Sequence, residues 1–378
     1  MKLRTISLLL VIVVASAVFT CSDDDCPVCT NQDPDHEPDY HVLYSYVYGE
    51  DFYDLVVLSY SVKHDSVVDS THYNGYPYSE PFTDVEFTQN GELSCYTLND
   101  FVPATWLTNT RTGDTIAVTH EYGGWDIEVS PSEDYVLISE SKYLAILTIP
   151  GLETVYASDS LQWDNAVFHP SENKVYYTKY GVDTIFVLSF NSEGEIATVS
   201  YPLRNSANKP VFNRWKSISP DGQFLIMDVA EGGGAYYFTA YNTTSFEVEQ
   251  ETPEPRLRSH YRHSWHPDGK RLFMPYGIER HDPNIAGIDV YNTSTGVLQS
   301  FVTLDELLMT FAEFRPSQVE FTPDGDLMIV SNQSAPPGSC GMILTLDIST
   351  GEVIQRFDAG PGELRSIGVL PIDYAREN

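Results

Sequence analysis

The stretch Ser217–Val229 reads Ser-Ile-Ser-Pro-Asp-Gly-Gln-Phe-Leu-Ile-Met-Asp-Val and has the features of a β-hairpin. Pro220 presets the backbone angle of the first central turn position, and Asp221 suits the second. Gly222 accepts the left-handed conformation that closes a bulged hairpin. The flanking residues are mostly apolar and β-branched, as strand residues are. The stretch therefore predicts a strand, a tight turn and a second strand.

Variants of this hairpin recur along the chain at intervals of about 40 to 55 residues, the spacing of four-stranded propeller blades. The other copies lie around Gln89, Pro131, Pro170, Pro267, Pro323 and Pro371. A second turn signal, Thr-Gly, follows several of the copies, at Gly113, Gly296 and Gly351. The repeating unit is therefore predicted to be a four-stranded antiparallel sheet with both turns on one face of the molecule.

The two ends of the chain each supply an incomplete unit. The last copy has only a first strand, near Leu364–Leu370, and the region Tyr40–Tyr73 has three strand-like runs without a Pro-Asp-Gly turn. One C-terminal strand and three N-terminal strands would complete a seventh sheet, and this pairing would remove open sheet edges. We predict an all-β, seven-bladed β-propeller over residues 40–378, closed by this interlock of its termini.

The Ser/Thr-Pro-Asp-Gly turn and the later Thr-Gly-x-Val turn resemble those of propellers with YVTN-type and lactonase-like repeats, between Tyr40 and Tyr374. The resemblance is specific for the fold. Lactonase-like propellers hold a divalent metal over the central channel with acidic and amide side chains. A divalent cation such as Ca²⁺ or Mg²⁺ is the cofactor that the resemblance would imply. The family's ligand positions do not align residue by residue with this sequence, so no metal ligand is assigned.

The first 20 residues have the features of an export signal. Two basic residues precede an apolar run, Ile6–Phe19, that is short for a membrane-spanning helix. The sequence ending at Cys21 resembles a bacterial lipobox, so we expect a lipid on Cys21, a disordered tether over residues 21–39 and anchoring to the outer membrane or cell surface of a bacterial envelope. Cleavage after Ala15-Ser16-Ala17 would instead give a secreted or periplasmic protein.

The chain is strongly acidic, with a formal net charge of −33 at pH 7. Such a surface repels nucleic acids, which excludes them as partners. The five cysteines indicate no disulfide framework in the core, although Cys26 and Cys29 are either free thiols or a small local disulfide. Cys26 and Cys29 fall in the predicted tether, while Cys95 and Cys340 fall in blades that are not neighbours and are expected to be free thiols. We expect a monomer.

Basic residues concentrate between Arg204 and Arg280. Loops that enter the first strand of a blade, and loops between its second and third strands, share the face on which propellers usually bind ligands. The predicted ligand-binding residues there are Arg214, Trp215, Arg258, His260, Arg262, His263, Arg280 and His281. Arginine forks suit carboxylate, sulfate or phosphate groups. The alternative is that these arginines form ion pairs with nearby acids such as Glu231, Glu251, Glu254 and Asp282.

Two aromatic-carboxylate pairs, Trp125-Asp126 and Trp163-Asp164, are expected just before the first strand of a blade, at other entrances to the predicted channel, which also carry Trp215, Gln318 and Arg365. Such pairs suit a sugar or a peptide, although aromatic residues also pack blades together. The histidines at 260, 263 and 266 resemble a metal-binding run, but strand residues three apart point to opposite faces and cannot share one ion. No metal site is predicted, and His266 is expected to be a turn residue.

No serine-hydrolase elbow, zinc-protease helix or phosphate loop is found in the sequence, so no catalytic residue is assigned. The favoured function is binding: a protein partner, or a small anionic or carbohydrate ligand, on the face formed by the loops described above. The alternative is a metal-dependent hydrolase similar to lactonases, with Asp126, Glu128 and Asp164 as channel carboxylates.

Overall fold

A computed structural model describes residues 40–48, 54–61, 66–73, 84–98, 103–124, 126–140, 142–158, 163–179, 181–191, 195–230, 236–252, 262–276, 286–303, 316–332, 340–361 and 363–371. The predicted signal and tether, with Cys21, Cys26 and Cys29, lie outside these residues. Within them the regular elements are strands, and no helix is long and apolar enough to cross a membrane.

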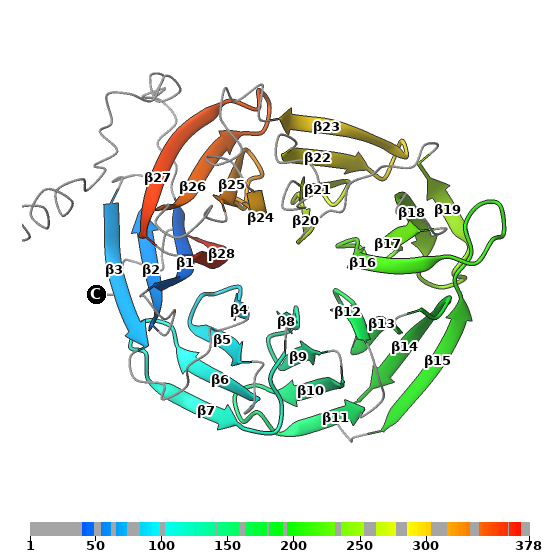
Figure 1. The fold of residues 1–378 in the computed structure, drawn as a ribbon, viewed down its shortest axis with the longest axis horizontal. Coiled ribbons are helices and arrows are strands. Elements are labelled where there is room, and N and C mark those ends of the chain that lie inside the picture. Colours follow the sequence, from blue (N-terminus) through cyan, green and yellow to red (C-terminus); the bar gives the residue numbers. More distant parts are fainter. Residues whose placement is uncertain are drawn as a thin grey trace, which may run out of the picture.

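Within the described residues, the strands form seven four-stranded antiparallel sheets arranged around a central channel (Figure 1). This arrangement confirms an all-β propeller of four-stranded antiparallel blades. The strands beside the channel are β4 (Asp84–Phe87), β8 (Asp126–Val129), β12 (Trp163–Phe168), β16 (Phe212–Ile218), β20 (Ser264–Trp265), β24 (Pro316–Phe321) and β28 (Glu363–Pro371). The second strands are β5 (Leu93–Leu98), β9 (Tyr135–Ser139), β13 (Lys174–Lys179), β17 (Phe224–Ala230), β21 (Arg271–Tyr276), β25 (Leu327–Asn332) and β1 (Tyr40–Tyr48).

The third strands are β6 (Ala104–Asn109), β10 (Leu144–Thr148), β14 (Thr184–Phe190), β18 (Tyr236–Asn242), β22 (Gly287–Asn292), β26 (Cys340–Asp347) and β2 (Asp54–Ser61). The outermost strands are β7 (Thr115–Thr119), β11 (Thr154–Ser158), β15 (Ile196–Pro202), β19 (Val248–Glu251), β23 (Val297–Thr303), β27 (Val353–Pro361) and β3 (Ser66–Tyr73). Two small differences from the sequence-based expectation concern Asp126 and Trp163-Asp164, which begin β8 and β12 instead of preceding them.

One sheet combines both ends of the chain. Its strand order is β28-β1-β2-β3, and β28 pairs antiparallel with β1 from Tyr40 opposite Pro371 to Val47 opposite Glu363. The three N-terminal strands lie close to where the sequence places them. Backbone hydrogen bonds between β28 and β1 therefore join the first and last parts of the described chain.

The turns follow the chemistry of the repeat. Gly222, Gly269 and Gly325 have φ values of 71°, 67° and 79°, in the left-handed region that glycine adopts without strain. In the Pro-Asp-Gly turn of β16–β17, the Ser219 hydroxyl donates to Asp221 Oδ1 at 2.5 Å and accepts from the Phe224 N–H at 2.9 Å. These side-chain bonds fix the hairpin register, which in turn fixes the residues that face the channel.

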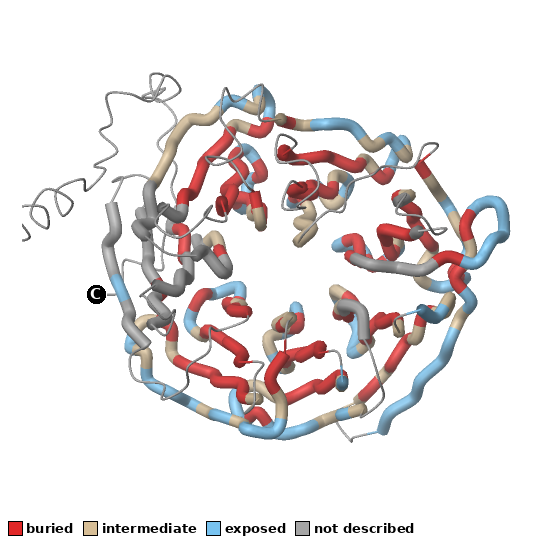
Figure 2. The backbone as a smooth tube through the Cα atoms, in the orientation of Figure 1, coloured by how far each residue is buried: buried red, intermediate tan, exposed pale blue. Residues whose placement is uncertain are grey.

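The hydrophobic cores lie between neighbouring blades. One core joins Leu137 and Ile146 of one sheet to Phe168 and Leu188 of the next, and comparable clusters occupy other interfaces in the described residues. Figure 2 shows that, among the described residues, those of the second and third strands are mostly buried, whereas many along the outer edge are exposed. Cys95 is buried and is a free thiol, as predicted, whereas the side chain of Cys340 is outside the described set.

Two histidines connect one blade to the turn of the next. His266 Nε2 donates to the carbonyl oxygen of Gly325 at 2.8 Å, and its Nδ1 accepts from the Asp268 N–H at 3.1 Å. His169 approaches Gly222 in the same way, because a Cβ on that glycine would lie 2.5 Å from His169 Nε2. His266 is therefore a turn residue, as the sequence predicts.

Candidate ligand site in the central channel

In six of the seven sheets, the repeat places a side chain at an equivalent position in the channel. Side chains alternate along a strand. In each of these repeats, the residue three positions before the turn proline, or before Gln89 in the first copy, points to the channel. These residues are Glu86, Glu128, Val167, Ser217, Ser264 and Glu320. All six line a single cavity of about 200 Å³. We call this cavity the channel site.

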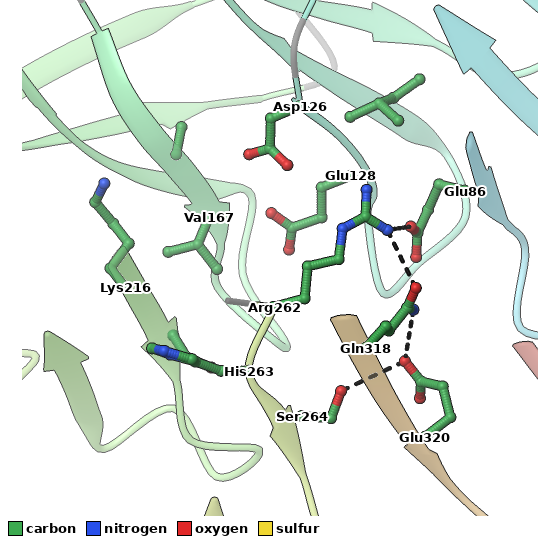
Figure 3. A pocket seen from close by; sticks show the side chains of 13 residues that line it. Glu86, Asp126, Glu128, Val167, Lys216, Arg262, His263, Ser264, Gln318 and Glu320 are labelled. Atoms are coloured by element: carbon green, nitrogen blue, oxygen red, sulfur yellow. Dashed lines mark hydrogen bonds and ion pairs between the residues drawn. The ribbon is translucent and has the colours of Figure 1, made fainter. Parts of the chain in front are cut away.

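Other residues of the same strands complete the channel site: Asp126, Ile127, Ala166, Lys216, Arg262, His263 and Gln318. Figure 3 shows the carboxyl groups of Glu86, Asp126, Glu128 and Glu320 around the side chain of Arg262, with Lys216 and His263 farther along the wall. Lys216 is only 5% exposed, and Gln318 is also 5% exposed. The site is thus polar but largely withdrawn from bulk solvent.

Arg262 spans the channel. It precedes β20, and its guanidinium forms an ion pair with Asp84 on β4, a strand of a blade across the ring. Its Nη1 also lies 4.0 Å from Glu86 Oε2 and donates to Gln318 Oε1 at 3.3 Å. Asp84 is 1% exposed and additionally accepts from the Ile127 N–H at 3.0 Å. Arg262 is therefore held by acidic and amide groups of its own protein.

Glu320 lies near Arg262 in the channel site and accepts two side-chain hydrogen bonds. Its Oε1 accepts from Gln318 Nε2 at 3.1 Å and from the Ser264 hydroxyl at 3.4 Å (Figure 3). Burial raises the pKa of Glu320 to about 7, while these two donors and Arg262 oppose the increase. Glu320 therefore changes charge close to neutral pH.

Asp126 and Glu128 form a second acidic group, because residues two apart on β8 share a face. Burial raises the pKa of Asp126 to about 6, against the opposing effects of Lys216 and the Ser139 hydroxyl. Burial, followed by repulsion from Asp126, raises the pKa of Glu128 well above its ordinary value, although Glu128 accepts from the Phe168 N–H at 3.3 Å. The two carboxyls therefore differ in their tendency to ionise.

Glu86 experiences the strongest crowding of like charge. Burial raises its pKa well above the ordinary value, and repulsion from Glu320, Glu128 and Asp126 adds to that increase. Its side chain remains 32% exposed, but its carboxyl lies among the protein atoms that line the cavity. Carboxyl groups that keep a proton near neutral pH can donate as well as accept hydrogen bonds.

The described residues do not form a metal centre of the usual kind. Among them, no three His, Cys, Asp or Glu side chains are grouped so that they could hold one ion. The carboxyls of the channel site instead surround the side chain of Arg262 (Figure 3). His263 lines the cavity and packs against Phe238, with ring centroids 5.9 Å apart.

The sequence-predicted site residues have mixed outcomes. Asp126, Arg262 and His263, together with Glu128 of the alternative proposal, line the channel site. Arg214 and Trp215 lie within β16, and Trp163 and Asp164 lie within β12, but their side chains are outside the described set. The structure does not describe Trp125, Arg258, His260, Arg280 and His281. For these residues the structure gives no placement relative to the cavity.

The ion pairs that the structure shows for arginines between Arg204 and Arg280 differ in part from those expected from the sequence. Arg262 pairs with Asp84, and Arg204 pairs with Asp183 at 2.5 Å. Neither acid is among those proposed from the sequence. Of those, Glu251 contacts Ser206 and Thr239, while Glu231, Glu254 and Asp282 lie outside the described residues. Arg204 and Asp183 flank strands β14 and β15 of one sheet, whereas Arg262 and Asp84 come from blades that are far apart in sequence and are brought together by the ring.

Glu86 and Glu320 were not predicted as channel residues from the sequence. A usable signal was present, because Val-Glu-Phe-Thr occurs at Val85–Thr88 and again at Val319–Thr322, with Ile-Glu-Val-Ser at Ile127–Ser130. Glutamate thus occupies one repeat position in three blades. Aligning the copies on their turns would have shown that these three side chains lie at the same height in the channel.

Comparison with known proteins supports the fold. No family model and no curated protein matches the sequence. Solved structures do match. The periplasmic gluconolactonase of Pseudomonas aeruginosa has a TM-score of 0.62 at 15% identity, over 88% of this chain and 99% of its own. A Bacteroides uniformis protein assigned as a 6-phosphogluconolactonase has a TM-score of 0.62 at 12% identity, over 88% and 100%.

Other similar structures belong to proteins with unrelated names. Hydrazine synthase of Kuenenia stuttgartiensis has a TM-score of 0.58 at 13% identity, over 76% of this chain and 90% of the matched chain. At these identities, similarity extends to the fold alone, since propellers support many functions. The lactonase-like neighbours agree with the resemblance noted in the turns.

Proposed function

We propose that the channel site binds a small, neutral, polyhydroxylated molecule, such as a monosaccharide. The cavity, at about 200 Å³, is smaller than the roughly 300 to 1,000 Å³ of sites for drug-sized ligands. A ligand of monosaccharide size or less is therefore the appropriate class. Its location on the channel axis allows groups from six blades to contact one molecule.

The observation that carries this proposal is the set of carboxyl groups with raised pKa values around one cavity. A sugar hydroxyl both donates and accepts, so it needs partners of both kinds. Glu86, Glu128 and Glu320 can act as donors when protonated and acceptors when ionised. Ser217 and Ser264 add hydroxyls to the same wall. Such a wall matches alternating hydroxyl groups on a ring.

An anionic ligand receives less support from this geometry. Arg262, a residue of the predicted anion patch, already has Asp84 and Glu86 as acidic neighbours. Acidic side chains outnumber basic ones in the cavity wall, so above about pH 7, where Asp126 and Glu320 are ionised, a carboxylate or phosphate would meet repulsion there. Of the small ligands predicted from the sequence, we therefore propose the neutral carbohydrate and not the anion.

The test is a calorimetric and thermal-shift comparison of neutral hexoses and pentoses with the corresponding sugar acids. A neutral sugar that binds the folded state should raise the melting temperature with concentration, and Glu320→Ala should weaken its binding by about tenfold or more. Glu172→Gln, at an exposed turn position, is the matched control. The proposal is wrong if only sugar acids bind, or if binding is equal in Glu320→Ala and the control.

A second candidate, hydrolysis of a sugar lactone, is favoured by the separate environments of Asp126 and Glu128. The Asp126 carboxylate, beside Lys216, would take a proton from a water molecule whose oxygen attacks the lactone carbonyl carbon. The bond from that carbon to the ring oxygen would then break, and protonated Glu128 would supply a proton to the departing oxygen. The names of the lactonase-like structural neighbours are consistent with this reaction class.

This candidate is tested by following acid release from gluconolactone and related lactones with a pH indicator. Asp126→Asn should lower kcat by roughly a hundredfold or more, because a positioned general base contributes about that much. Binding of the corresponding neutral sugar should persist in the variant. If wild type and Asp126→Asn release acid equally, the hydrolase candidate fails while the binding proposal stands.

We further propose that the protein is exported and carries a lipid on Cys21, with the propeller acting as a monomer outside the cytoplasm. Metabolic labelling with a radioactive fatty acid should mark wild type and not Cys21→Ser. Label in both forms, or in neither, would remove the lipid anchor and favour cleavage at the alternative site. A protein partner remains the expectation if no small molecule binds.

A further inference from the structure

Gln318 makes a pair of contacts that resemble those of a peptide group. Its Oε1 accepts from the Ile367 N–H at 3.3 Å, and its Nε2 donates to the Ile367 carbonyl oxygen at 3.2 Å. Ile367 lies on β28 opposite Tyr44 of β1. The Gln318 side chain, from β24, thus satisfies both backbone groups that Ile367 turns away from β1. It joins the closing sheet to the preceding blade.

The same amide group also contacts the channel site. Its Oε1 accepts from Arg262 Nη1 at 3.3 Å, and its Nε2 donates to Glu320 Oε1 at 3.1 Å. Both atoms of the amide are therefore shared between the backbone of β28 and a charged side chain of the site. Because Gln318 is 5% exposed, water does not readily replace these contacts.

We propose that Gln318 is a positioning residue of the channel site, which uses the backbone of β28 as an anchor to hold Glu320 and Arg262. The structure assigns β28 an indirect part in the site, through Ile367 and Gln318. This inference rests on the proposed function only in treating Glu320 as a ligand contact, and its experiment needs no ligand. A failure of sugar binding would therefore leave it testable.

The surroundings of Glu320 decide what loss of the amide would do. The charged groups that act on it are Arg262, from the segment before β20, and Glu86, from β4. Ser264 donates from β20, and Ile367 of β28 contributes its backbone through Gln318. Gln318 is thus one of two side-chain hydrogen-bond donors to this carboxyl, and its donation favours the ionised form.

The experiment is a titration of the glutamate carboxyl carbons by ¹³C NMR in the full chain, with the Glu320 signal assigned by its absence in Glu320→Gln. In Gln318→Met the pKa of Glu320 should rise by about one pH unit, the equivalent of one hydrogen bond to a charged group. Gln250→Met is the matched control. Gln250 also bridges two blades, by accepting from the Tyr291 hydroxyl at 2.8 Å, but it is outside the channel site.

A second variant separates the anchor from its effect on the site. Gln318→Glu keeps an oxygen to accept from the Ile367 N–H and from Arg262, but it removes the donor to Glu320. Hydrogen exchange of the Ile367 amide should stay slow in Gln318→Glu and become about fivefold faster in Gln318→Met. The pKa of Glu320 should rise in both variants.

Two results would overturn the inference. If Glu320 titrates identically in wild type, Gln318→Met and Gln318→Glu, Gln318 does not position the carboxyl. If Gln250→Met shifts the Glu320 titration as much as Gln318→Met, the effect reflects general loosening of the ring. Should Gln318→Met fail to fold, Gln318→Asn replaces it, because it keeps a neutral amide in the buried site while the shorter side chain withdraws the donor from Glu320; an unchanged Glu320 titration in that variant would overturn the inference.

Discussion

At the residue scale, Arg262 connects stability to the chemistry of the channel. Its partner Asp84 is 1% exposed, and without Arg262 that carboxylate would keep, among the described residues, the backbone donors Val85 and Ile127. A buried charge that loses its counterion destabilises the folded state strongly. The cross-channel ion pair therefore serves to neutralise Asp84 as well as to shape the cavity.

We predict that Arg262→Gln lowers the free energy of unfolding by roughly 3 kcal/mol, as measured by urea denaturation at pH 7. Lys174→Gln is the control. Lys174 pairs with the half-exposed Glu172 at 2.7 Å, and loss of such a surface pair should cost about 0.5 kcal/mol. Equal midpoints for the two variants would contradict the structural role assigned to Arg262.

The pKa of Glu320 predicts a pH dependence of stability. The folded protein holds this proton up to about pH 7, whereas the unfolded chain releases it near the ordinary value of 4.5. Between these values the folded state binds more protons, so the stability contributed by the protonated group falls as pH rises. The contribution is complete below about pH 4.5 and is lost by about pH 7.

Glu320→Gln should therefore gain stability relative to wild type across this pH window, by about 1 to 3 kcal/mol in total. The measurement is urea unfolding at several pH values between 4.5 and 8, at constant ionic strength. Glu172→Gln should show no such gain, because Lys174 and other contacts lower the pKa of Glu172. A constant difference between Glu320→Gln and wild type would show that Glu320 ionises normally.

At the element scale, the Pro-Asp-Gly turns contribute to contacts between blades as well as to the hairpins. Gly325 and Gly269 occupy equivalent turn positions with similar φ values of 79° and 67°. A Cβ at Gly325 would lie 2.7 Å from the His266 ring, whereas a Cβ at Gly269 would meet nothing within 4 Å. An alanine at either glycine would strain the backbone, but only an alanine at Gly325 would also clash with His266. Comparing the two variants therefore isolates the cost of the clash.

We predict that Gly269→Ala destabilises the protein by about 1 kcal/mol, the cost of a left-handed alanine. Gly325→Ala should cost about 2 kcal/mol more, because the new methyl group would displace His266 from its hydrogen bond with the next blade. Thermal and urea unfolding of both variants provide the comparison. Similar losses in the two variants would mean that the contact between blades contributes little.

The hairpins were predictable from sequence because their determinants are local. Pro220, Asp221 and Gly222 act within four residues of one another, and each copy of the turn repeats the same chemistry. The three N-terminal strands were also located, since alternation of apolar residues needs no tertiary information. Strand boundaries shifted by one to three residues, as at Asp126, where hydrogen bonding to β9 begins earlier than the pattern suggests.

The channel site was predicted only in part, because it depends on which blades face each other. Asp126 and Glu128 were identified, but Glu86 and Glu320 were not, although the three glutamates share one repeat position. The pairing of Arg262 with Asp84 joins residues in different quarters of the sequence. No local pattern encodes such a contact, which arises when the ring closes.

At the scale of the whole molecule, the pairing of β28 with β1 closes the ring and places Gln318 beside the channel. Without β28, the β1 edge of its sheet would be unpaired and the amide of Gln318 would lose Ile367. Exposed sheet edges and unsatisfied buried amides both disfavour the folded state. Closure should therefore be required for cooperative folding.

We predict that deleting residues 364–378 abolishes cooperative thermal unfolding, observed by circular dichroism. A circular permutant that begins at Glu363, joins Pro371 to Tyr40 through a short glycine-rich linker and ends at Pro361 should fold, because those two residues are already paired. A truncated chain that keeps the melting temperature of the full protein would disprove the role of β28.

The equivalence of the six channel positions has an implication for how this architecture acquires new ligands. Each position belongs to a separate blade whose turns and cores are specified by other residues, so one exchange alters the wall of the cavity and leaves those turns and cores intact. Glutamate in three blades and serine or valine in the others is one combination among many. Gene duplication supplies the blades, and selection can then change their inward side chains one at a time.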